Sequence, residues 1–306
     1  GYGIEDAAPI QHFIGYAFHH WSNPARRYAV LMGEGTYDPK NNLGTKPAGF
    51  LLPVKLGPTS FSWSPRDNWF GMVNGADQLV DVAIGRIAAT TTNGISRVVR
   101  KTIAFEQASR LPTATLVADN NDVTSGYYFG ADSDSNIFNR LAPASYSMVK
   151  AYLQGSTTNA VRDTIRNNIN GGRHLVTYFG HGNTTLWCAE DVWNINDIAS
   201  LTNSRFPIVT IFSCQNGSFE DPGAECLAEQ FLEQTTNGAV AVMAPASESI
   251  QARANELAVG FFSEFTNQTT RLGDSLSAGL TRVWQSNPFS YELWFYGILG
   301  DPALKK

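Results

Sequence analysis

The chain has 306 residues, a formal net charge of −5 and a charged fraction of only 16%. A chain of this length can form one large α/β domain or two smaller ones around a sizeable core. It has neither the clustered Lys and Arg of a nucleic-acid surface nor the run of about 20 apolar residues of a membrane-spanning helix, which excludes both classes.

Apolar strands alternate with amphipathic helices almost throughout, which is typical of a βα-repeating sheet covered on both faces. Leu111-Pro112 interrupts the pattern, so we predict an N-terminal α/β subdomain over 1–110 and a C-terminal subdomain over 111–306. The first unit contains a helix, two strands and a second helix, predicted at Pro9–Trp21, Arg27–Met32, Leu79–Ile87 and Asn93–Ser109.

The second unit is longer and continues the alternation to the end of the chain. Its strands are predicted at Ala114–Ala118, Ser145–Tyr152, His174–Phe179, Pro207–Phe212, Ala239–Met243 and Tyr291–Gly297. Its helices are predicted at Ser133–Leu141, Thr158–Asn170, Gly223–Gln234, Gln251–Thr266 and Gly273–Gln285.

Two short motifs follow apolar runs that read as buried parallel strands. They are Tyr178–Gly182 (Tyr-Phe-Gly-His-Gly) and Ile211–Gly217 (Ile-Phe-Ser-Cys-Gln-Asn-Gly). They place His181 and Cys214 at the carboxyl ends of successive strands, where open parallel sheets bind ligands. Either residue alone is more often structural, but together they are the parts of a cysteine nucleophile with its proton-transfer partner. Gly182 has no Cβ and lets a substrate carbonyl approach the backbone closely.

The three cysteines allow one disulfide and one free thiol. Cys188 lies seven positions after His181, and Cys226 lies twelve after Cys214, so both follow the two motif strands. We predict a Cys188–Cys226 disulfide that leaves Cys214 free, as suits a secreted cysteine enzyme. Three free thiols in a reducing compartment are the alternative, because spacing alone cannot show that the Cα atoms lie within about 7 Å.

No metal is predicted to take part in the chemistry, because the chain lacks Cys-x-x-Cys and His-x-x-x-His spacings for zinc. The Asn/Asp/Ser-rich segment 119–136 contains carboxylates that could hold a structural calcium ion. Solvated turn acids are the favoured interpretation, since there is no EF-hand pattern. The four carboxylates are Asp119, Asp122, Asp132 and Asp134.

Together, these motifs resemble the gingipain-type cysteine peptidases of the caspase-like clan. The order of the motifs, His before Cys on neighbouring strands, is that of the clan. The resemblance implies a caspase-like α/β/α sandwich with mostly parallel sheets in two side-by-side subdomains, the second of them catalytic. It covers nearly the whole chain and is carried by Tyr28–Pro39, Arg66–Phe70, Asp81–Ile87, Tyr178–Gly182, Ser213–Phe219 and Gly300–Leu304.

The resemblance also implies roles for individual residues. His181 matches the catalytic histidine and Cys214 the nucleophile, while the backbone N–H groups of Gly182 and Cys214 match the oxyanion hole. Asp119 falls where the family has an acid that orients the histidine, although that acid is Glu in the family.

A preference for Arg or Lys before the scissile bond is a further implication of the resemblance. A buried carboxylate at the pocket floor would pair with a guanidinium and reject uncharged side chains. We expect Glu248 to supply it, because it lies in the loop after the next strand beyond the nucleophile. Asp132 is the second candidate.

The expected function is a cysteine endopeptidase that acts on protein or peptide substrates as a secreted or cell-surface microbial monomer. It needs no cofactor for its chemistry. The chain begins Gly1-Tyr2-Gly3 without Met, so we expect a processed or excised piece of a longer product. A transpeptidase, in which an amine resolves the acyl-enzyme, remains an alternative. So does a surface binding module without turnover, although that function has no chemical need for both His181 and Cys214.

Overall fold

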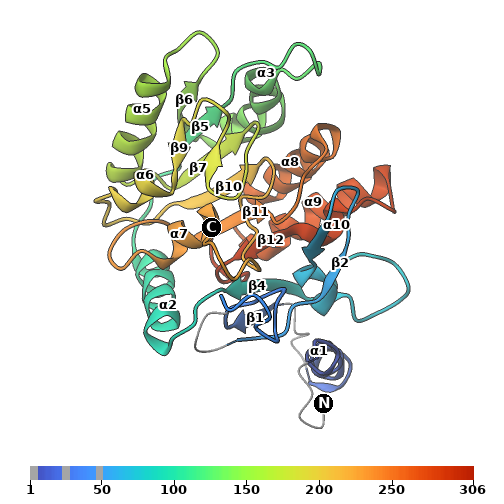
Figure 1. The fold of residues 1–306 in the computed structure, drawn as a ribbon. Coiled ribbons are helices and arrows are strands. Elements are labelled where there is room, and N and C mark those ends of the chain that lie inside the picture. Colours follow the sequence, from blue (N-terminus) through green and yellow to red (C-terminus); the bar gives the residue numbers. More distant parts are fainter. Residues whose placement is uncertain (1–5, 23–27, 46–50) are drawn as a thin grey trace.

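The structure, a computed structural model, describes residues 6–22, 28–45 and 51–306. Its centre is an eight-stranded sheet in the order β1-β4-β12-β11-β10-β7-β5-β6 (Figure 1). Neighbouring strands are parallel except β11 and β12, which are antiparallel. The strands are β1 (Tyr28–Met32), β4 (Ala83–Ile87), β5 (Thr113–Ala118), β6 (Ser147–Tyr152), β7 (Leu175–Phe179), β10 (Ile208–Phe212), β11 (Ala241–Pro245) and β12 (Tyr296–Leu299).

Helices pack on both faces of this sheet, and each face has its own apolar core (Figure 1). One face carries α2 (Thr92–Gln107), α5 (Thr158–Asn170), α6 (Ile195–Ala199) and α7 (Leu227–Glu233). The other carries α3 (Phe129–Ser133), α4 (Asn139–Leu141), α8 (Gln251–Phe265), α9 (Leu272–Ser286) and α10 (Glu292–Phe295). This arrangement confirms the predicted α/β fold with a mostly parallel sheet between helices.

Smaller elements complete the fold. Helix α1 (Ala8–His20) packs near the β1 edge against the 3₁₀ helix η1 (Asp67–Gly71). Two short antiparallel pairs lie outside the main sheet: β2 (Leu56–Pro58) with β3 (Trp63–Pro65), and β8 (Leu186–Trp187) with β9 (Trp193–Asn194). The π-helical turn η2 (Asp134–Phe138) and the 3₁₀ turn η3 (Ala142–Ala144) flank α4. Among the described residues, no helix is both long and apolar enough to cross a bilayer.

The local sequence explains why the strands and the helix around the two motifs form. Every residue of β7 and of β10 is buried, as expected for central strands of a parallel sheet. In α5, the Thr157 hydroxyl accepts the backbone N–H of Ala160, and Val161, Ile165 and Ile169 form one buried stripe. The two motif strands are therefore held rigidly between helices.

The structure corrects the predicted last strand. Residues from Glu292 to Phe295 form α10, and the strand begins only at Tyr296. The buried amide of Asn68 donates to the carbonyls of Leu293 and Tyr296, at 2.9 and 2.8 Å, and so braces both ends of this turn. An apolar run this short does not distinguish helix from strand by its pattern.

Other predicted boundaries shift by smaller amounts. The helix predicted from Gly223 begins at Leu227, and the one predicted from Ser133 begins at Phe129. Arg27, predicted to open the first strand, lies outside the described residues. Strands from both sides of residue 110 share the main sheet, because β12 lies between β4 and β11. The boundary at 110 itself stays a prediction.

Candidate active site

The two motif residues leave the sheet at the same level of neighbouring strands. β7 pairs with β10 in parallel, with Phe179 opposite Phe212. His181 and Cys214 each lie two positions beyond this pair. The register therefore brings the imidazole-bearing and thiol-bearing loops to one place at the carboxyl edge.

Cys214 lies half-buried in a tight loop that continues through Gln215 in the left-handed region, at φ 55°. The backbone N–H of Ser249 donates to its Sγ at 3.4 Å. Burial raises the pKa of the Cys214 thiol, the Ser249 N–H opposes this, and the charges of Glu248 and Glu292 raise it further. The resting group is therefore a protonated thiol, and a base must remove its proton before it can attack.

The His181 ring is held by an acid and two aromatic rings. Its Nε2 lies 3.6 Å from Oδ2 of Asp122, and the His181 side chain is half exposed. Phe129 packs edge-on against it with ring centroids 5.1 Å apart, and Tyr127 lies at 6.1 Å. With Nε2 turned toward Asp122, Nδ1 is the nitrogen left to exchange a proton with a thiol.

Asp122 is itself fixed by a turn. Its Oδ1 accepts the backbone N–H groups of Thr124 and Ser125, both at 3.1 Å. Hydrogen bonds from the Ser125 side chain and backbone, with a smaller effect of His181, hold the pKa of Asp122 below its usual range. Asp122 therefore presents a carboxylate to the imidazole. Sequence reasoning missed this role, because it depends on how the turn folds back over the β7 edge.

Asp119 has a different position from the one expected of an orienting acid. Its buried carboxylate accepts the backbone N–H of His181 at 3.1 Å and that of Asn120 at 2.8 Å. Burial raises the pKa of Asp119, and these two backbone hydrogen bonds oppose the rise. Asp119 therefore holds the backbone of His181, and the carboxylate near the ring is that of Asp122.

Two backbone donors beside the thiol have no acceptor within the described part of the chain. Neither Gly182 N–H nor Cys214 N–H donates a backbone or side-chain hydrogen bond there. A Cβ on Gly182 would come within 2.9 Å of Asn216 Oδ1 and 3.0 Å of Ser213 Oγ, so Gly182 packs directly on the loop that carries Cys214. Unpaired N–H groups in this position could bind a developing oxyanion.

The two candidate pocket acids flank the segment that contacts the thiol. Glu248 accepts the Gln215 amide at 2.8 Å and the Ser247 hydroxyl at 3.0 Å. Asp132, on α3, accepts the side-chain amides of Gln251 and Asn255 at 2.8 and 3.3 Å. Both carboxylates are half-buried.

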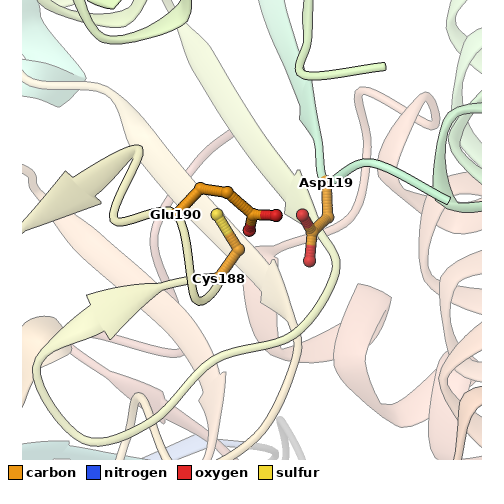
Figure 2. Close-up of side chains that lie close together, drawn as sticks. All are labelled: Asp119, Cys188 and Glu190. Carbon is orange, nitrogen blue, oxygen red and sulfur yellow. The ribbon is translucent and has the colours of Figure 1, made fainter. Parts of the chain in front are cut away.

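The predicted disulfide is not formed in the structure, where Cys188 and Cys226 are buried free thiols. Cys188 has φ 52° and lies beside Asp119 and Glu190 (Figure 2). Cys226 lies at the N-terminus of α7, where its backbone N–H donates to Glu229. Both cysteines belong to the same apolar core, so matching offsets along the chain do not by themselves produce a bond.

The thiol of Cys188 and the carboxylates of Asp119 and Glu190 point toward one another, with one potential ligand atom from each within 4.8 Å of the others (Figure 2). Asp122, Asp132 and Asp134, the other acids considered for calcium, do not join this group among the described residues. Asp122 faces His181, Asp132 faces α8, and Asp134 pairs with Lys150 at 2.7 Å. The structure thus does not gather the four acids into one site.

Comparisons with known proteins agree with this fold. The chain is 27% identical over 196 residues to gingipain R2 and to gingipain R1 of Porphyromonas gingivalis, an alignment that covers 61% of the chain. It spans 25% of the length of that gingipain R2 and 19% of that gingipain R1.

Solved structures show the same architecture over almost the entire chain. The crystal structure of the Arg-specific cysteine proteinase gingipain R has a TM-score of 0.81 at 22% identity, covering 98% of this chain and 68% of that one. The complex of the pro- and mature domains of RgpB from Porphyromonas gingivalis has a TM-score of 0.80 at 23% identity, covering 98% and 70%. The model of peptidase family C25 matches residues 1–306, and the chain therefore belongs to that family.

Proposed function

We propose that this chain is a cysteine endopeptidase that cleaves peptide bonds through a thioester on Cys214. The observation that carries the proposal is the joint placement of His181 and Cys214 at equal register, with two backbone N–H groups beside the thiol that no described residue accepts. Membership of a peptidase family supports it.

The first half of the reaction forms the acyl-enzyme. Nδ1 of His181 takes the thiol proton, and Sγ of Cys214 attacks the carbonyl carbon of the scissile bond. The oxygen becomes an oxyanion that accepts from the N–H groups of Gly182 and Cys214, each such donor being worth about 3 kcal/mol of barrier. As the C–N bond breaks, His181 returns its proton to the leaving amine.

The second half releases the product. A water molecule gives a proton to His181 and attacks the thioester carbonyl, and the second tetrahedral species expels the thiolate of Cys214. The proton held by His181 then restores the thiol. Asp122, whose Oδ2 lies 3.6 Å from Nε2 of His181, orients the ring in both halves.

Replacing Cys214 tests the proposal directly. We expect Cys214→Ala to lower kcat for peptide hydrolysis by about 10⁴-fold or more, because covalent catalysis is lost. Its melting temperature should stay within a few degrees of that of the unaltered chain. The buried Cys188→Ala is the matched control, since it removes a thiol outside the proposed machinery. Unchanged hydrolysis by a folded Cys214→Ala protein would contradict the proposal.

We further propose that the pocket prefers Arg or Lys before the scissile bond, through Glu248 and Asp132. Support comes from their half-buried carboxylates: Glu248 directly precedes Ser249, whose N–H donates to the thiol, and Asp132 accepts the side-chain amide of Gln251, two positions after Ser249. The structural relative gingipain R is an Arg-specific proteinase, which agrees with this preference.

A peptide library with varied residues before the cut tests the preference. Glu248→Gln and Asp132→Asn should each reduce kcat/KM for Arg substrates by about tenfold to a hundredfold, with little change for apolar substrates. Asp134→Asn is the control, because that acid pairs with Lys150 instead. A preference for apolar or acidic residues in the unaltered chain would rule out the basic pocket while leaving the Cys214 chemistry intact.

A further inference from the structure

A cavity of about 300 Å³ opens at the edge of the sheet opposite to His181 and Cys214. Its wall includes Thr113, His174 and Phe206, which lie at or just before the amino ends of β5, β7 and β10. A five-residue strand spans roughly 17 Å, so this cavity is separate from the proposed catalytic loops.

The cavity wall is strongly basic in an otherwise acidic chain. Arg110, Arg173 and Arg205 line it, and no Asp or Glu does. None of these guanidinium groups lies within 4.0 Å of a carboxylate among the described residues. They come from three separate segments that the fold brings together around one space.

Nearby helix ends offset part of this positive charge. Arg110 donates to the carbonyl of Phe105 in the last turn of α2, and Arg173 donates to Asn168 in the last turn of α5, at 2.6 Å. Each helix carboxyl end carries about half a negative charge, so the two ends offset about one of three positive charges. An excess of about two positive charges remains, and the side chain of Arg205 makes no hydrogen bond to the described residues.

Apolar and aromatic side chains share the rest of the wall with Ser, Thr and Asn residues. Phe105, Leu111 and Phe206 line the cavity. The buried ring of His174 stacks on Phe105 with centroids 5.8 Å apart, and its Nε2 has no hydrogen-bond partner among the described residues. Phe105 is itself buried, with the guanidinium of Arg110 3.8 Å from its ring centroid, so Leu111 and Phe206 offer the more accessible apolar surface beside the guanidinium groups.

We propose that this cavity binds a small organic anion that joins a flat apolar body to a carboxylate. The guanidinium of Arg205, assisted by Arg173 and Arg110, would hold the carboxylate through charge-assisted hydrogen bonds. The apolar body would pack against Leu111 and Phe206. The volume is at the lower end of that of small-molecule sites and suits one or two rings, not a peptide.

Titration calorimetry with 2-naphthoate on the full chain tests this site, with Cys214→Ala used throughout to exclude reaction at the thiol. We expect saturable binding with one ligand per chain and Kd below about 1 mM. The neutral 2-naphthamide should bind at least about tenfold more weakly, because it cannot form the charge-assisted pair. Inorganic phosphate should also bind more weakly, because it lacks the apolar body.

Arg205→Gln should weaken naphthoate binding about tenfold or more, and it should fold normally because Arg205 is exposed. Arg100→Gln is the matched control, an exposed arginine of α2 that does not line the cavity. Equal binding of naphthoate by the Arg205→Gln and Arg100→Gln proteins, or no saturable binding at all, would overturn the proposal. Phosphate binding as tight as naphthoate would overturn the assignment of an apolar body.

Discussion

At the scale of single residues, the backbone and the ring of His181 are held by different groups. The Asp119 carboxylate accepts the backbone N–H of His181. The backbone carbonyl of His181 accepts the N–H of Cys188 at 2.9 Å. The ring is left to Asp122 and the aromatic pair. This division separates the fixing of the loop from the orientation of the group that transfers protons.

The division predicts different consequences for the two acids. Asp122→Asn should lower kcat about five- to tenfold with little change in melting temperature, because an exposed contact between a carboxylate and a half-exposed imidazole contributes little to stability. Asp119→Asn should mainly lower the melting temperature, because its buried carboxylate holds two backbone N–H groups. Parallel kinetics and thermal melts separate the effects. A large loss of stability in Asp122→Asn would contradict this assignment.

The His181 and Cys214 loops could be located from the sequence because each directly follows a buried apolar run. Asp122 could not be found in the same way. Its contact with the ring depends on a turn closed by Thr124 and Ser125, and no periodicity reports the direction of a turn. The resemblance gave Asp119 the position of the orienting acid, but it does not fix which atoms that carboxylate binds, and these are backbone N–H groups.

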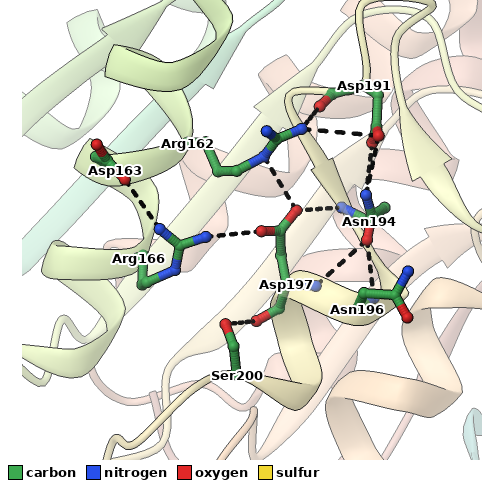
Figure 3. Close-up of polar contacts among 8 residues, drawn as sticks. All are labelled: Arg162, Asp163, Arg166, Asp191, Asn194, Asn196, Asp197 and Ser200. Carbon is green, nitrogen blue, oxygen red and sulfur yellow. Dashed lines mark hydrogen bonds and ion pairs between the residues drawn. The ribbon is translucent and has the colours of Figure 1, made fainter.

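At the scale of elements, a polar network ties α5 to β9 and α6 (Figure 3). Asp197 is its centre: its carboxylate forms ion pairs with Arg162 at 3.2 Å and Arg166 at 2.8 Å, and it accepts the backbone N–H of Asn194. The Asn194 side chain in turn accepts the N–H of Asp197 and so closes a capping box on α6. One buried carboxylate thus serves both the start of a helix and the contact between helices.

Removing the carboxylate of Asp197 should lower the stability of the fold. We expect Asp197→Ala to lower the free energy of unfolding by about 2–4 kcal/mol, because two arginines and a helix cap lose their partner. Asp163→Ala is the control: Asp163 pairs with the same Arg166, but its side chain is 65% exposed, so its loss should change stability by less than about 0.5 kcal/mol. Urea titrations give both values, and equal losses would contradict a central role for Asp197.

Most helices and strands could be predicted to within a few residues, because their apolar periodicity is local. The run that includes α10 was misassigned, since its conformation depends on hydrogen bonds from Asn68, far away in the sequence. Long-range partners of this kind leave no mark on the local pattern.

At the scale of the whole molecule, the interior contains carboxyl groups that hold protons near neutral pH. Burial raises the pKa of Glu34 to about 7 and that of Glu220 to about 8. One oxygen of Glu220 is buried without a hydrogen-bond partner among the described residues. Their folded-state pKa values lie above the unfolded value of 4.5, so the folded state binds more protons over this range.

Stability should therefore decrease as pH rises from about 4.5 to about 8, by up to about 1.4 kcal/mol per pH unit for each group. Glu220→Gln should remove the part of this pH-dependent loss of stability that Glu220 causes. The variant should therefore melt at an increasingly higher temperature than the unaltered chain as pH approaches 8. Thermal melts at several pH values check this. The exposed Glu225→Gln is the control, and a constant difference across pH would contradict the expectation.

The position of β12 also constrains the order in which the chain can fold. β1 and β4 reach the rest of the main sheet only through this strand, which lies within the last eleven residues of the chain. Until β12 is in place, β4 and β11 therefore each keep an unpaired edge. Such late, long-range closure slows folding and leaves open strand edges that can pair wrongly with other chains. A chain truncated before Tyr296 would lose not one edge strand but the link between the two parts of its sheet.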